Sequence, residues 1–162
     1  MATTINILCL VVLILAGAGL IRADLRDGIL PDWMNALVAA SGFIRTLALE
    51  DLAQALWDIA AGLAVGAALL LLRRLYAMLR GRQGLGLGDV KFLMAATLWT
   101  GLTELPIVLL IATTTALAAV LALSIAGRSM TGQTALPFGP FLVIGLAGAL
   151  LLQGEGWSIM PL

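Results

Sequence analysis

The chain has 162 residues, of which 62% are hydrophobic and 11% charged, and its formal net charge is zero. A composition this apolar, with a mean hydropathy of +1.10, excludes an ordinary soluble domain and predicts an all-α integral membrane protein. The balanced charge predicts no nucleic-acid partner. One cysteine, Cys9, and no histidine exclude an intrachain disulfide, a cysteine-based zinc site and a Ser–His protease. We expect neither a metal nor a cofactor.

Six apolar segments follow one another along the chain, and each is a candidate membrane span. They cover residues 5–21, 32–49, 52–79, 89–100, 105–126 and 138–152. The third carries Gly62 and Gly66, a spacing of small residues that lets two helices approach closely. No long polar insertion separates the segments, so we predict one domain, 1–162, built as a polytopic bundle of about six transmembrane helices.

Basic residues alternate between the connections that join these segments. The connections on one side hold eight of the nine: Arg22, Arg26, Arg73, Arg74, Arg80, Arg82, Lys91 and Arg128. The other side holds only Arg45. The positive-inside rule makes the basic side cytoplasmic, and both termini are then predicted to face the other compartment.

Two aspartates that are far apart in the sequence fall on this basic side. Asp24 lies just past the first segment, and Asp89 ends the glycine-rich turn Gly84–Gly88 where the fourth segment begins. A carboxylate at a membrane boundary is costly and marks a candidate functional site. Two nearby carboxylates share one proton, so that one activates a water while the other donates to a carbonyl oxygen. This is aspartyl protease chemistry.

Structural explanations compete with this one. Asp89 could simply cap the next helix. Asp27 precedes Gly28 in an apparent turn, and Asp32 follows Pro31 and could cap the second helix, so both are expected to be structural or solvated. A Ser–Lys peptidase would need Lys91, the only lysine, and no serine lies near it in the sequence.

Three blocks of the sequence resemble the type IV prepilin peptidases, membrane aspartyl proteases that process pilins and type II secretion pseudopilins. Gly84–Lys91 resembles the GxGD signature, Asp24–Asp32 the other catalytic segment, and Pro137–Leu142 the third shared block. A GxGD motif alone also occurs in presenilin-like and signal-peptide peptidases. The three blocks in this order are more specific.

The resemblance implies a role for each matching residue. Asp24 and Asp89 match the catalytic pair. The residues expected to contact substrate are Gly86, Gly88, Lys91, Pro137, Phe138, Gly139 and Pro140. The two motif glycines would let the backbone turn sharply and a substrate strand come close. Lys91 is expected to reach the lipid headgroups, and the Pro137–Pro140 block either walls the site or forms a rigid helix start.

The function implied is cleavage of the basic leader from a prepilin or pseudopilin at the cytoplasmic boundary of the bacterial inner membrane. Longer members of the family add an N-terminal methyltransferase domain, often with paired Cys-x-x-Cys zinc ligands. This chain resembles the short members without that domain, and we expect cleavage without methylation.

Two alternatives remain from the sequence. One is a different GxGD protease, either of the preflagellin type or of the signal-peptide type, which would place an aspartate within a helix. The other is a non-catalytic membrane scaffold or transporter in which Asp24 and Asp89 bind ions or protons.

Overall fold

The structure, a computed structural model, describes residues 1–81, 84–126 and 137–154. These residues form six α-helices and no strand: α1 (Ala2–Asp27), α2 (Asp32–Leu49), α3 (Leu52–Arg80), α4 (Leu87–Thr100), α5 (Leu105–Ile125) and α6 (Gly139–Gly154). The predicted all-α class and the six segments are confirmed, with boundaries that shift by a few residues. Arg82 and Arg128, two of the eight basic residues that predict the cytoplasmic side, lie outside the described residues.

Three of the described helices, α1, α3 and α5, are long and apolar enough to cross a membrane, and α6 is a shorter apolar helix. Their outward side chains are large and apolar: Leu63 is 59% exposed and Leu117 is 69% exposed. Exposing such a surface to water costs free energy, whereas lipid tails solvate it. The fold is therefore an all-α membrane bundle.

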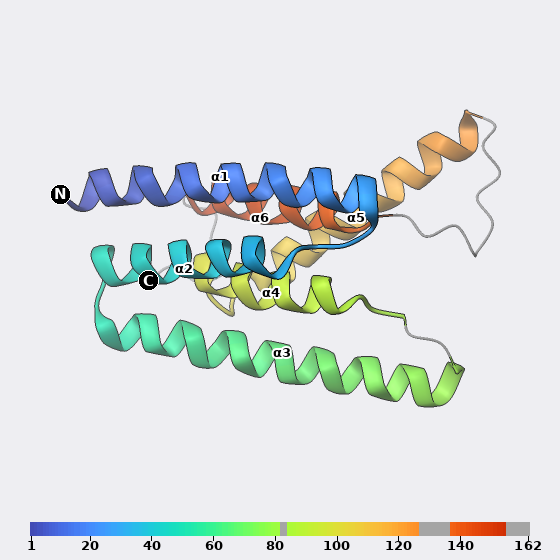
Figure 1. The fold of residues 1–162 in the computed structure, drawn as a ribbon, viewed down its shortest axis with the longest axis horizontal. Coiled ribbons are helices and arrows are strands. Elements are labelled where there is room, and N and C mark those ends of the chain that lie inside the picture. The colour runs from blue at the N-terminus through green and yellow to red at the C-terminus, as the bar shows by residue number, and fades with distance from the viewer. Residues whose placement is uncertain (82–83, 127–136, 155–162) are drawn as a thin grey trace.

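The short helix α4 forms the centre of the bundle. Figure 1 shows α1 and α3 along opposite edges, with α2 and α4 between them. Helix α4 contacts α2, α3, α5 and α6, and eight of its 14 residues are buried. A helix that is covered on most sides needs no polar stripe, which explains why the segment from Phe92 to Thr100 carries no charged residue.

Glycines in α3 allow it to lie close against α4. A Cβ atom added to Gly62 would lie 3.0 Å from the carbonyl oxygen of Met94, and one added to Gly66 would collide with the Met94 side chain. This contact confirms the packing role predicted for the Gly62 and Gly66 spacing.

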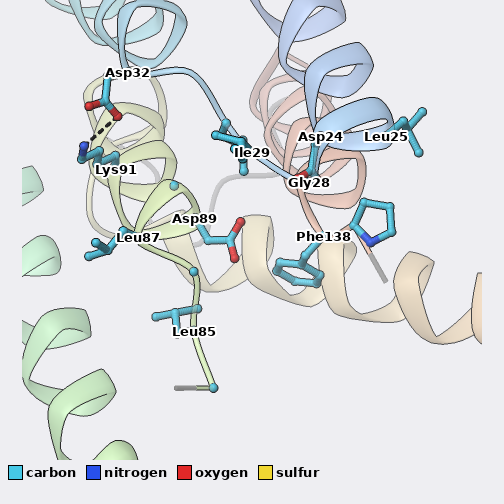
Figure 2. Close-up of a pocket in the computed structure, with 15 residues that line it drawn as sticks. Asp24, Leu25, Gly28, Ile29, Asp32, Leu85, Leu87, Asp89, Lys91 and Phe138 are labelled. Atoms are coloured by element: carbon cyan, nitrogen blue, oxygen red, sulfur yellow. Dashed lines mark hydrogen bonds and ion pairs between the residues drawn. The ribbon is translucent and has the colours of Figure 1, made fainter. Parts of the chain in front are cut away.

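The connections at the ends of the helices bring four chain segments together at one end of the bundle. Gly28 ends α1 in the left-handed conformation, with φ 64°, which a residue without a Cβ adopts at little cost. Pro31 then precedes α2 with an extended backbone. The end of α1 and the starts of α2, α4 and α6 consequently meet around one cavity (Figure 2).

Candidate active site

A cavity of about 1000 Å³ opens at this end of the bundle, and both Asp24 and Asp89 line it. Asp24 comes from the last turn of α1 and Asp89 from the first turn of α4. Figure 2 shows the Asp89 side chain projecting from α4 toward the wall that holds Asp24 and Phe138. The structure thus brings together the two carboxylates that the sequence singled out.

Asp24 is held by the beginning of α6. Its side chain is only 5% exposed, and its Oδ2 accepts a hydrogen bond of 2.7 Å from the backbone N–H of Gly139. The first N–H groups of a helix have no partner within the helix and carry a partial positive charge. This hydrogen bond therefore stabilises the ionised form of the Asp24 carboxylate.

Gly139 is required because no side chain fits between it and Asp24. A Cβ added to Gly139 would lie 2.8 Å from Oδ2 of Asp24. Of the block predicted to contact substrate, Pro137 and Phe138 line the cavity, whereas Gly139 and Pro140 are not among the residues that line it. Pro140 lies in the first turn of α6, where a missing N–H costs nothing, in agreement with the rigid helix start.

Asp89 lies at the start of α4 but is not its cap. The cap position belongs to Gly86, but the Asp89 carboxylate accepts a hydrogen bond from the backbone of Gly86, so the capping explanation holds in part. Asp89 also lies outside the three helices that could cross a membrane. Burial raises the pKa of its carboxyl to about 6, the negative charge of Asp24 adds to the rise, and a backbone hydrogen bond from Gly86 opposes it.

The motif glycines serve close approach, and the chain bends at Leu85 between Gly84 and Gly86 without a positive φ. Gly86 has an ordinary φ of −66°, and among the described residues only Gly28, Gly81 and Gly101 have positive φ. A Cβ on Gly86 would lie 2.9 Å from Oδ2 of Asp89, and one on Gly88 would lie 3.0 Å from Cβ of Leu30. Both glycines line the cavity, so they leave room for the carboxylate and for the neighbouring loop.

Lys91 and Asp32 pair with each other across the cavity rim. The Lys91 Nζ donates to Oδ1 of Asp32 at 2.6 Å, as the dashed line in Figure 2 shows. The headgroup role of Lys91 stays a prediction, since its side chain is half exposed beside this partner. The capping role predicted for Asp32 is wrong, because the cap position of α2 is Pro31.

Asp27 is exposed at the end of α1 and pairs only loosely with its neighbour Arg26, at 3.6 Å. Its predicted position before the Gly28 turn, as a solvated side chain, is confirmed.

Several apolar residues of the cavity were missed by sequence reasoning. Leu25, Ile29, Leu30, Leu85 and Leu87 all line it. Their only signal is that they flank the two aspartates in the sequence, because a leucine at a helix end looks the same whether it faces lipid, protein or a cavity.

Fold and cavity together define a helical membrane protein with two carboxylates at one end of its bundle. Comparison with known proteins assigns it to one family. Residues 7–123 match the model of the type IV leader peptidase family. The leader peptidase HopD of Escherichia coli is 37% identical over 125 residues, which are 74% of this chain and 76% of that protein. The chain belongs to the type IV leader peptidase family. No solved structure matches it.

Longer relatives match over part of their length. The prepilin leader peptidase/N-methyltransferase of Burkholderia pseudomallei is 45% identical over 76 residues, 47% of this chain and 24% of the relative. That of Dickeya chrysanthemi is 36% identical over 138 residues, 83% of this chain and 47% of the relative. The matched part of this chain thus corresponds to a quarter to a half of these longer proteins.

An aspartate within a helix is the feature expected of the signal-peptide type of protease, and it does not separate that type from the leader peptidases here. Asp24 lies within α1. The assignment to the leader peptidases therefore depends on the family match over residues 7–123, which includes both aspartates but ends before Pro137.

The Gly139→Ala substitution tests whether the contact between α6 and Asp24 matters for peptidase activity. The added methyl group would displace the carboxylate, and misplacement on the ångström scale lowers catalytic rates substantially. We expect cleavage of a prepilin to slow by about tenfold or more. Gly154→Ala, near the end of the same helix with open space around it, is the matched control. Equal activity of the two variants would contradict the role assigned to this contact.

Proposed function

We propose that the chain is an aspartyl endopeptidase that removes the basic leader from type IV prepilins or pseudopilins at the cytoplasmic face of the bacterial inner membrane. The observation that carries the proposal is that Asp24 and Asp89 line one cavity in a member of the leader peptidase family. The basic residues Arg22, Arg26, Arg73, Arg74 and Arg80 support a cytoplasmic cavity, with both termini on the other side.

The surroundings of the two aspartates support different roles for them. The N–H of Gly139 stabilises negative charge on Asp24, whereas burial and the charge of Asp24 raise the pKa of Asp89 to about 6. Two carboxyl groups whose environments differ in this way divide into a base and an acid. We assign the ionised base to Asp24 and the protonated acid to Asp89.

The mechanism follows from this division. Asp24 takes a proton from a water molecule as the water oxygen attacks the scissile carbonyl carbon, and Asp89 gives its proton to the carbonyl oxygen. In the second step the tetrahedral carbon releases the amine, which takes the proton from Asp24, while Asp89 recovers its own. The reaction needs a water, two carboxyl groups and no metal.

The cavity suits an extended polypeptide. A peptide bond inside a helix is protected by its own hydrogen bonds, so the junction of leader and apolar helix must be extended when it is cut. Gly86 and Gly88 have no side chains and so leave space along the α4 side of the cavity. The side chains of Pro137 and Phe138 form another part of the lining. These groups could hold a strand between the two aspartates.

The direct test replaces each aspartate. Asp24→Asn and Asp89→Asn keep the shape of the side chain but remove the acid–base group, and each should lower cleavage of a co-expressed prepilin at least about 100-fold. Asp27→Asn, an exposed position nearby, should process the substrate as the wild type does. Full processing by either of the first two variants would remove that residue from the catalytic pair. Absence of cleavage by the purified wild-type chain would instead favour the scaffold or transporter explanation.

The pH dependence of cleavage follows from the pKa of Asp89. The raised pKa means that the carboxyl keeps its proton up to about pH 6 and loses it above. Once both carboxyl groups are ionised, no proton is available for the carbonyl oxygen. We expect kcat/KM on a peptide substrate to fall about tenfold per pH unit on an alkaline limb whose midpoint lies near that pKa. Activity that keeps rising through this range would contradict Asp89 as the acid.

We further propose that these 162 residues cleave without methylating the product. Longer relatives carry N-methyltransferase in their names, but the single cysteine of this chain cannot form the paired Cys-x-x-Cys pattern associated with that activity. With S-adenosylmethionine present, mass spectrometry of the mature product should show a free N-terminal amine. A product heavier by one methyl group would refute this.

A further inference from the structure

A second cavity continues from the first into the apolar layer of the bundle. It has a volume of about 300 Å³ and lies between α2, α3 and α4. We call it the α2–α3–α4 groove. Its lining includes Asn35, Ala36 and Ala39 of α2, Gly62 of α3, and Ala95 and Leu98 of α4. Asp32 and Lys91 line both cavities, so the ion pair between them marks the point where the two meet.

The groove runs in the direction a substrate helix would take. Helices α2 and α4 both begin at the Asp24–Asp89 cavity and lead away from it. From Lys91 to Leu98 the rise along α4 is about 10 Å, so the groove reaches well below the level of the aspartates. The small residues Ala36 and Ala39 keep the α2 side of the groove low, which lets another helix approach closely.

Asn35 is a polar side chain without a partner in this apolar setting. It is 4% exposed, and neither Nδ2 nor Oδ1 has a hydrogen-bond partner among the described residues. A buried amide in this state destabilises the protein unless a ligand or a rearrangement satisfies it. Lipid tails offer neither a donor nor an acceptor. A polypeptide offers both, and the first turn of a helix has N–H groups that lack an internal partner.

We propose that the α2–α3–α4 groove binds the apolar segment of the substrate that follows the scissile bond, with the Asn35 amide pairing with backbone groups of its first turn. The inference rests on the proposed function and adds a docking site to it. The leader and the cut bond occupy the cavity of the aspartates, and the apolar helix continues past the Asp32–Lys91 pair into the groove. Substrate is thereby positioned along the membrane normal before it is cut.

Filling the groove should discriminate between long and short substrates. Ala36 is exposed on α2, so Ala36→Phe fills the groove without entering the core. For a membrane-inserted prepilin relative to a short peptide that ends just after the junction, the ratio of kcat/KM values should fall at least about tenfold. Ala64→Phe, an exposed position on α3 that is not among the groove residues, is the matched control and should leave the ratio unchanged.

Asn35→Leu is the second variant, and it separates binding from folding. Removing the unsatisfied amide should raise the Tm of the free enzyme by a few degrees while raising KM for the membrane-inserted prepilin. A variant that loses both stability and activity would show a structural role and overturn the assignment. An unchanged ratio for Ala36→Phe, or an equal loss on both substrates, would also overturn it.

Crosslinking tests docking independently of cleavage. The chain carries Asp89→Asn, Cys9→Ala and Ala36→Cys, and the prepilin carries one cysteine in its first apolar turns. A disulfide adduct should form, and Ala64→Cys should give none. No adduct, together with labelling of the groove by a photoreactive phospholipid that prepilin does not displace, would identify a lipid site and refute the proposal. Failure of the proposed function would appear separately, as a wild-type chain that cleaves neither substrate.

Discussion

The hydrogen bond from the Gly139 N–H to Asp24 is the contact on which the geometry of the site depends. It joins the last turn of α1 to the first residue of α6, two segments at nearly opposite ends of the sequence. It also places a negative charge where a helix terminus stabilises it. Without it a carboxylate that is 5% exposed would lack this compensation beside a second carboxyl group. One contact thus fixes the position of Asp24 and supplies a hydrogen-bond donor to its buried carboxyl group.

The sequence allowed the fold class and the six helices to be predicted, because apolar runs of this length have few other solutions in a membrane. It also pointed to Asp24 and Asp89, since carboxylates at the ends of apolar segments are conspicuous. Helix ends were less certain. The charged residues from Arg22 onward end the apolar run but not the helix, which continues until Gly28 supplies the left-handed cap.

The partners of the polar groups could not be predicted. Lys91 and Asp32 lie far apart in the sequence, and each had a reasonable local explanation, as a headgroup contact and as a helix cap. Only the packing of α2 against α4 brings them to 2.6 Å. Gly86 and Gly139 are predicted from the sequence to contact substrate, but their closeness to the two aspartates is visible only in the structure, where the atoms nearest to an added Cβ belong to Asp89 and Asp24.

The central position of α4 has a consequence for the biogenesis of the protein. A helix of 14 residues is shorter than a bilayer normally requires, so it gains little from lipid and depends on its four neighbours for a stable place. Its neighbour α6 comes last in the chain. The packing around α4, and with it the wall of the cavity that carries Asp89, is therefore complete only after α6, the last of the described helices, has joined the bundle.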